Sequence, residues 1–158
     1  MYGEIEKCDI ELLNAFSNLS GAAQRDFRDY MRYLLTKQYK RELMAAIFGN
    51  GLLHSLIQSL LHITEREEFQ ITLIENRMKQ ISELYFGIFE KIHCKYMALV
   101  DGLDSCELVK DFGRGSIDNI NRACMSGNRM LIRMEVNEFY EGYYKFARKK
   151  EARNIVAV

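Results

Sequence analysis

The sequence contains no proline and no tryptophan, and only 10 of its 158 residues are glycine. A β-sandwich or a β-barrel needs many tight turns, which draw on glycine, proline, asparagine and aspartate. Here the turn residues gather at only a few points along the chain. This shortage argues against an all-β fold and predicts an all-α protein built from a few long helices.

The chain also lacks an excess of charge, because 22 Lys and Arg residues balance 22 Asp and Glu residues. A strong sequence-independent grip on nucleic acid rests on many basic contacts with phosphate, so this balance argues against one. We find no signal peptide, and no apolar run comes near the roughly 18 residues that a membrane-spanning helix needs. We therefore expect a cytoplasmic protein that does not enter the membrane.

Cysteine is scarce as well, and none of the four cysteines stands in a CxxC pair, which leaves a structural zinc site poorly supported. Free cysteine is one of the residue types most often buried in protein cores. We expect reduced cysteines that act as small apolar core residues, and we assign no metal and no cofactor. The four positions are Cys8, Cys94, Cys106 and Cys124.

What the sequence does contain is helical periodicity, which predicts a single domain over residues 1–158 with five to six helices. An N-terminal helical hairpin is expected over residues 1–48, with Ser20 as the cap of its second helix. Central helices follow over residues 52–103, with Thr64 and Glu67 as a capping box. C-terminal helices are expected over residues 104–153, with turns at Gly49-Asn50-Gly51, Gly113-Arg114-Gly115 and Ser126-Gly127-Asn128.

The longest expected helix covers residues 64–103 and carries apolar residues spaced alternately by 3 and 4. Three heptads of this kind are typical of a coiled-coil seam. A helix near 40 residues would be about 60 Å long, more than a domain of this size spans, so Gly87 is a point where it could break. We expect a homodimer, with self-association through Ile74, Met78, Ile81, Tyr85, Ile88 and Ile92. The alternative is that the same stripe is the central core of a monomeric bundle.

Two surface features suggest a protein partner. The last helix is crowded with aromatic residues that cannot all face one core; its expected apolar face holds Leu131, Met134, Phe139, Tyr143 and Phe146. Tyrosine is enriched at interfaces because it has an apolar body and a polar tip. The candidate partner-binding residues are therefore Tyr140, Tyr143 and Tyr144, with Arg28 and Arg32 on the basic face of the second helix as a second patch.

Two other classes of function stay open. The pair Glu90 and His93 forms half of a di-iron E-x-x-H motif, and His54 and His62 can share a helix face, so a metal-binding bundle enzyme is one alternative. Residues 107–123 have the look of a helix-turn-helix with its turn at Gly113, so a DNA-associated regulator is another. No arrangement of nucleophile and base is found, and we assign no catalytic residue.

Residues 19–43 read LSGAAQRDFRDYMRYLLTKQYKREL. This stretch resembles the helical segment that follows the DNA-binding domain in Xre-type transcriptional regulators of Firmicutes. In that family a helix-turn-helix domain precedes the segment, whereas 18 residues precede it here. The resemblance implies an oligomerising or partner-binding part of such a regulator. The resulting hypothesis is a non-catalytic bacterial regulatory protein that dimerises and binds a protein partner through helical surfaces.

Overall fold

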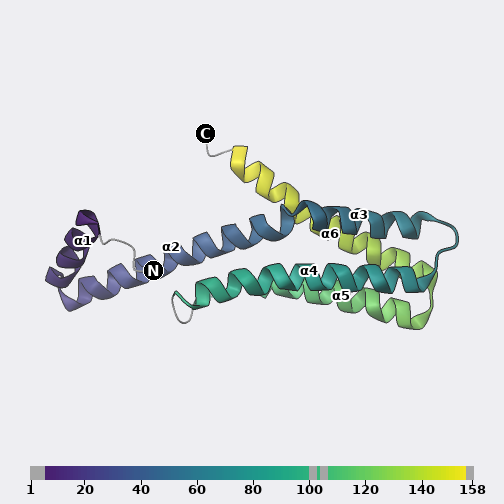
Figure 1. Cartoon of the computed structure of the whole chain (residues 1–158), viewed down its shortest axis with the longest axis horizontal. Coiled ribbons are helices and arrows are strands. Elements are labelled where there is room, and N and C mark those ends of the chain that lie inside the picture. The colour runs from purple at the N-terminus through teal and green to yellow at the C-terminus, as the bar shows by residue number, and fades with distance from the viewer. Residues whose placement is uncertain (1–5, 100–102, 104–106, 156–158) are drawn as a thin grey trace. The chain divides into compact units, whose positions relative to one another are not determined.

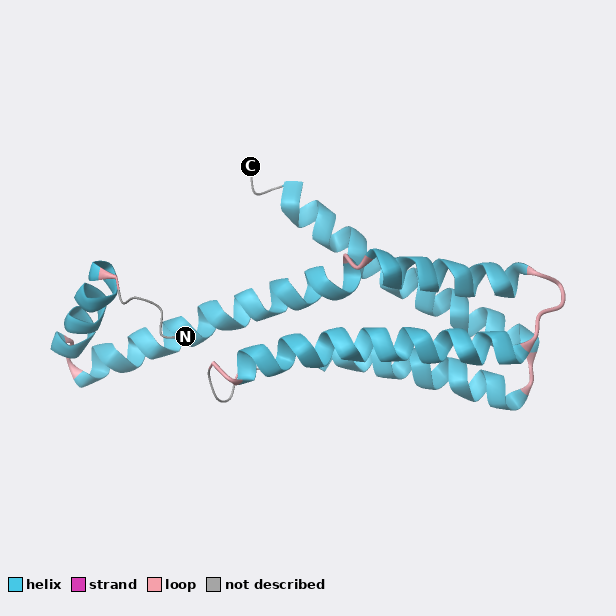
Figure 2. Cartoon of the chain, in the orientation of Figure 1, coloured by secondary structure: helices cyan, strands magenta, loops and turns pink. Residues whose placement is uncertain are grey.

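The computed structural model describes residues 6–99, 103 and 107–155, with the backbone alone for residues 150–155. These residues form helices joined by short loops, and none of them lies in a strand (Figures 1 and 2). The predicted all-α fold is confirmed. In chain order the helices are α1 (Lys7–Asn18), α2 (Gly21–Phe48), α3 (Gly51–Glu65), α4 (Ile71–Met97), α5 (Glu107–Ser126) and α6 (Arg129–Ile155).

The chain divides into two compact units, an N-terminal unit over Met1–Lys37 and a C-terminal unit over Gln38–Val158. The boundary falls inside α2, so this helix contributes its first part to one unit and its last part to the other. The N-terminal unit is a pair of helices, α1 and the start of α2. The C-terminal unit holds the end of α2 and all of α3 to α6.

The helix starts follow from polar side chains that accept hydrogen bonds from free backbone N–H groups. The Ser20 hydroxyl accepts from the N–H of Ala23 at 3.2 Å, as predicted for the start of α2. The Asn50 side chain accepts from the N–H of Leu53 at 2.9 Å and so begins α3 just after the glycine-rich turn. At the third turn, Gly127 adopts a positive φ of 69°, which glycine tolerates and other residues rarely do.

The C-terminal unit is a four-helix bundle in which α3 packs on α4, α4 on α5, α5 on α6, and α6 back on α3. Each helix therefore buries its apolar face against two neighbours. Burying one large apolar side chain stabilises a fold by about 1.5–3 kcal/mol, so this closed ring supplies most of the stability of the chain. The largest side chains with almost no exposed surface include Leu53, Ile57, Tyr85, Phe89, Phe139 and Tyr143.

Glycine sets the spacing between the helices of this bundle at two positions. A Cβ atom at Gly113 would lie 2.2 Å from Cε1 of the Tyr85 ring, so α5 approaches α4 closely only because this residue has no side chain. Likewise, a Cβ atom at Gly142 would lie 2.7 Å from Cε2 of Phe112. The expected turn at Gly113 is wrong, because α5 runs through it without a break. A straight helix over residues 107–123 cannot be a helix-turn-helix.

The predicted start and end of the long helix are also wrong. Thr64 lies in the last turn of α3, where its hydroxyl donates to the carbonyl of Leu61 at 2.7 Å, so it does not form a capping box with Glu67. The N-cap of α4 is Gln70, and α4 ends at Met97 rather than continuing to residue 103. The helix does pass through Gly87 unbroken.

The inward face of α6 differs from the predicted one at its start. Ile132 and Val136 are buried there, whereas Met134 is exposed and Leu131 is only half-buried. The expectation that the cysteines are core residues holds for Cys124, which is buried, and is wrong for Cys8 and Cys94, which are exposed. Cys106 lies outside the described residues.

Candidate interaction surface

The residues predicted to form a dimer seam lie inside the C-terminal unit. Five of the six, Ile74, Met78, Ile81, Tyr85 and Ile92, are buried against the chain's own helices, and Ile88 is half-buried. The helices α3 and α5 of the same chain cover the heptad-like stripe on α4, as the alternative of a monomeric bundle predicts. Dimerisation stays a prediction, and a dimer that leaves this bundle closed needs another surface.

The aromatic cluster of α6 is tied to the end of α2 and to α3. The Tyr143 ring is fully buried and its hydroxyl donates to the carbonyl of Ile47 at 2.8 Å, so this residue packs the core and offers no surface to a partner. The hydroxyl of Tyr144 lies 3.2 Å from Nδ1 of His54 and accepts a bond from Gln58 at 3.0 Å. Burial raises the pKa of Tyr143, and to a smaller extent burial also raises that of Tyr144.

His54 completes this network. Its Nε2 lies 2.9 Å from the carbonyl of Phe48, which can only accept, so Nε2 donates to it, while Nδ1 lies 3.2 Å from the hydroxyl of Tyr144. The carbonyls of the last turn of a helix have no partner within the helix. His54 and Tyr143 therefore supply hydrogen-bond partners to the carbonyls of Phe48 and Ile47 at the end of α2. Tyr140 is half-buried and packs on Tyr144 with ring centroids 4.5 Å apart, which leaves its other half open to a partner.

A second polar cluster joins α2 to the end of α4. Glu42 accepts hydrogen bonds from Nζ of Lys95 at 2.8 Å and from the hydroxyl of Tyr96. The bond from Lys95 first, and that from Tyr96 second, lower the pKa of the Glu42 carboxyl. Nearby, the hydroxyl of Tyr39 lies 3.0 Å from Nδ1 of His93. The cluster holds the last part of α2, after Lys37, against α4.

Two arginines of α6 fasten the loop between α3 and α4. The Arg133 guanidinium donates to the carbonyls of Thr64 at 2.8 Å, Arg66 at 2.6 Å and Glu67 at 2.8 Å. Nε of Arg129 donates to the carbonyl of Phe69 at 3.2 Å, and both guanidinium groups lie over the Phe69 ring. These bonds satisfy carbonyl groups at the end of α3 and in the loop, where the sequence suggested the start of a helix.

The three histidines lie apart, each with a different partner. His62 lies 3.0 Å from Glu65 at the end of α3, while His54 and His93 bond to tyrosines. Within residues 6–99, 103 and 107–155, no three His, Cys, Asp or Glu side chains come together as metal ligands would. The arrangement of these residues therefore gives no support to a di-iron or zinc centre.

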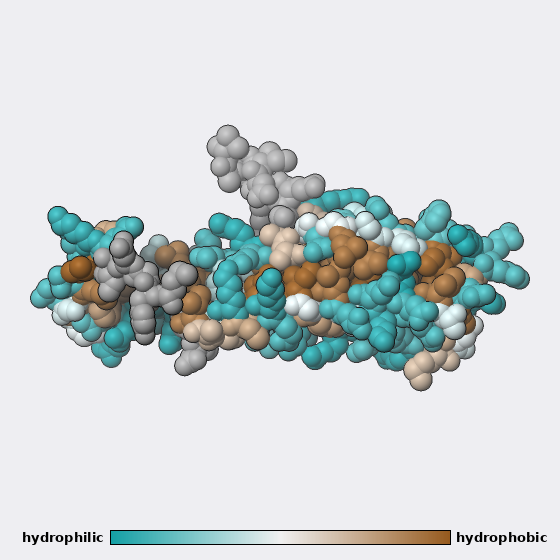
Figure 3. All heavy atoms as spheres, in the orientation of Figure 1, coloured by the Kyte–Doolittle hydropathy of each residue, from teal (hydrophilic) through white to brown (hydrophobic). Residues whose placement is uncertain are grey.

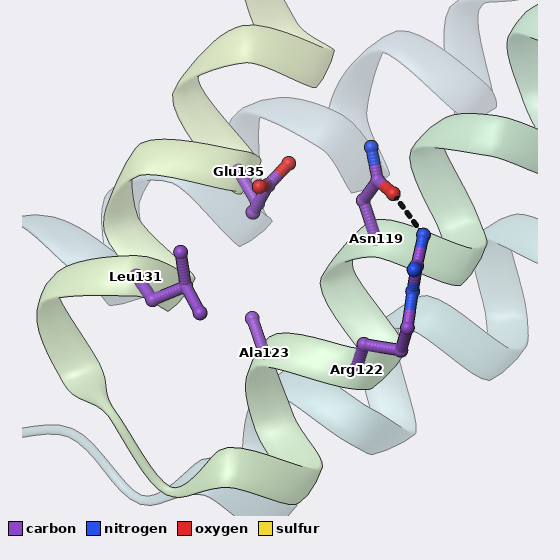
Figure 4. Close-up of a pocket in the computed structure, with 5 residues that line it drawn as sticks. All are labelled: Asn119, Arg122, Ala123, Leu131 and Glu135. Atoms are coloured by element: carbon purple, nitrogen blue, oxygen red, sulfur yellow. Dashed lines mark hydrogen bonds between the residues drawn. The ribbon is translucent and has the colours of Figure 1, made fainter.

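The bundle surface has a hollow between α5 and α6. Figure 4 shows the residues that line it, Asn119, Arg122, Ala123, Leu131 and Glu135. The guanidinium of Arg122 turns toward Asn119 and donates to its Oδ1 at 2.6 Å, so it does not meet Glu135. The hollow brings together no pair of groups suited to acid–base or nucleophilic chemistry.

The N-terminal unit, in contrast, has little internal packing. Its helices touch through Phe16 and Phe27, whose ring centroids lie 5.5 Å apart, and the Arg28 guanidinium lies 5.3 Å from the centroid of Phe16. The Gln24 amide also donates to the carbonyl of Phe16 at 3.0 Å. No described residue of this unit, from 6 to 37, is buried. The hairpin is held by one aromatic contact and a few polar ones.

The apolar side chains of the N-terminal unit are instead exposed, and Figure 3 shows hydrophobic residues at its surface. Eight large ones each leave between 41% and 60% of their area uncovered. A group of large apolar side chains open to water usually marks a surface that another molecule covers. We call this group the hairpin surface; it consists of Ile10, Leu12, Leu13, Leu19, Tyr30, Met31, Tyr33 and Leu34.

Sequence reasoning missed the hairpin surface, because a stripe with helical periodicity looks the same whether it faces a core or water. The structure explains the exposure, since the unit ends at Lys37 and a unit below about 40 residues rarely builds its own core. The predicted residues Arg28 and Arg32 do lie on this hairpin and are exposed.

Neither a known protein family, nor a curated protein, nor a solved structure matches this chain. In the described part of the chain, no single helix is long and apolar enough to cross a membrane. Only α2 and α3 taken together, with a bend of 48° between them, meet that requirement of length and composition.

Proposed function

We propose that this protein is a regulatory interaction protein, in which the N-terminal hairpin binds another protein and the four-helix bundle is a stable support. The observation that carries the proposal is the contrast between the two units. The bundle closes around a buried core and exposes seven large apolar side chains among the described part of its 121 residues, whereas the hairpin exposes eight within 37 residues and buries none of those described. A helical partner that lays its own apolar stripe against the hairpin would bury these eight side chains.

The composition of the hairpin surface favours a protein partner. Tyrosine and methionine are enriched at protein interfaces, where an aromatic ring supplies contact area at little entropic cost and methionine adapts its shape. The surface has both, with Tyr30 and Tyr33 stacked at 6.3 Å between ring centroids and Met31 beside them in the sequence. Asp26 and Asp29 alternate with the arginines of the same helix, which weakens an attraction to nucleic acid.

The test is capture of partners from the native host by the tagged full-length protein, with and without nuclease. Leu34→Asp alters the hairpin surface, and Leu108→Asp is the matched control, because Leu108 is an exposed leucine of the bundle. We expect a stoichiometric protein that survives nuclease, is lost with Leu34→Asp and is kept with Leu108→Asp. Nucleic acid in the eluate, or partners that disappear with nuclease, would contradict the proposal and favour a DNA-associated regulator.

A further inference from the structure

We infer that the occupant of the hairpin surface is a second copy of the same chain. In this dimer the two N-terminal hairpins pack face to face and complete one four-helix arrangement that neither copy can form alone. The inference rests on the proposed function in one respect, namely that the hairpin surface is a binding surface. It goes further by naming the partner, and three observations support that choice.

The first observation concerns size. The N-terminal unit has 37 residues and buries none of those described, so it lacks a core of its own. Small helical units of this kind are stabilised by oligomerisation. A surface that must be covered whenever the chain is folded is best covered by a partner that is always present at the same concentration. A second copy meets that condition by definition.

The second observation concerns area. An aromatic side chain offers on the order of 150–250 Å² and the aliphatic ones offer less, so eight side chains at roughly half exposure present on the order of 600 Å² per copy. A standard stable interface buries about 800 Å² from each partner. Not every one of the eight can face the partner at once, but the backbone and polar rim add to the contact. The hairpin surface therefore has the size that a symmetric dimer of modest affinity requires.

The third observation concerns charge. Residues 6–18 hold three acidic groups, Glu6, Asp9 and Glu11, against one basic group, Lys7, for a net charge of −2. Residues 21–37 hold four basic groups against two acidic groups, for a net charge of +2. In a two-fold dimer each surface meets its own copy, so α1 of one hairpin can lie beside α2 of the other. Opposite charges then meet at both rims, and the copies do not repel each other.

The heptad stripe of the C-terminal unit is closed to a second copy. Ile81 and Tyr85 are fully buried within a single chain, so the dimer contact has to come from a surface that is open in the single chain. Two exposed bundle leucines, Leu52 and Leu108, serve as controls because they stand in the first turns of α3 and α5. An aspartate is tolerated in the first turn of a helix, where it faces the positive end of the dipole.

The experiment is sedimentation of the full-length chain over a range of micromolar concentrations, compared with four variants. Leu13→Asp and Leu34→Asp place a charge in the hairpin surface; Leu52→Asp and Leu108→Asp place the same charge on the bundle. We expect wild type and both controls to dimerise equally, and both hairpin variants to raise the dimer dissociation constant more than tenfold. Circular dichroism shows whether each variant keeps its helices.

A second measurement locates the contact without mutation. Light and heavy-isotope copies are mixed, cross-linked through lysines and digested, so that cross-links between copies are recognised by mass. Links that join Lys7 or Lys37 of one copy to the hairpin of the other support the inference. A monomeric wild type, or a dimer that the two hairpin variants leave unchanged, would overturn it. The proposed function survives a monomeric wild type if Leu34→Asp still loses a captured protein, so the two failures are distinguishable.

Discussion

Replacing Gly113 by alanine tests the packing of the four-helix bundle most sharply. Within a helix, alanine is favoured over glycine by about 1 kcal/mol, so propensity alone predicts a more stable protein. The structure predicts the opposite, because the new Cβ atom would lie 2.2 Å from Cε1 of Tyr85, well inside van der Waals contact. The ring has no room to withdraw, since Tyr85 is fully buried and its hydroxyl donates to the carbonyl of Val109 at 2.6 Å.

The size of the effect follows from these contacts. Overpacking a core by one methyl group costs about 1–3 kcal/mol, and pulling the Tyr85 hydroxyl from its acceptor leaves a buried polar group unpaired, at a cost of about 1–3 kcal/mol. A small shift of α5 reduces both of these costs. The higher helix propensity of alanine offsets about 1 kcal/mol of the remaining loss. We expect Gly113→Ala to lower the free energy of unfolding by about 2–3 kcal/mol.

The assay is urea unfolding followed by circular dichroism, with Gly115→Ala as the matched control. Gly115 lies on the same helix and its added Cβ atom would meet no atom within 4 Å, so this variant should gain up to about 1 kcal/mol. When Gly113→Ala is combined with Tyr85→Leu, the loss of stability should be less than the sum of the two single losses, because Tyr85→Leu removes the ring that the new methyl group would strike. A Gly113→Ala protein as stable as Gly115→Ala would refute the close approach of α4 and α5.

Three further predictions concern other contacts of the C-terminal unit. Arg133→Met should lower the free energy of unfolding by about 1–3 kcal/mol in the same assay, because it leaves three carbonyls without their charged donor, and Arg133→Lys should restore only part of the loss. Since the pKa of Glu42 lies below its ordinary value of 4.5, its contact with Lys95 should stabilise the fold above that pH and lose this effect as the pH falls through the lowered pKa. The effect should be small because the pair is exposed, and a Glu42→Gln variant whose stability falls with acid just as that of the wild type does would contradict it. A thiol reagent followed by peptide mapping should modify exposed Cys8 and Cys94 within minutes and Cys124 only on unfolding, because burial hides that thiol and raises its pKa.

The sequence alone determined the helical class and most of the helix ends. No proline and few glycines left a pattern dominated by 3.6-residue periodicity, and this pattern placed α2 at its observed bounds. Local side-chain caps are a matter of neighbours in sequence, so Ser20 and the turn at Gly49-Asn50-Gly51 could be recognised without a structure. The sequence also predicted correctly that the apolar residues of α4 lie along one face of the helix.

Only the tertiary structure decided what each stripe faces. The periodicity of α4 suits a dimer seam and a bundle core equally, and its burial by α3 and α5 depends on how distant segments pack. Gly113 resembles a hinge in the sequence, yet it stands inside α5, where the Tyr85 ring of α4 fills the space that a side chain would occupy. Thr64, expected to start a helix, lies at the end of α3 instead, where its carbonyl accepts from Arg133, a residue far along the chain. The hairpin surface emerged in the same way, because apolar residues are exposed or covered according to their neighbours in space.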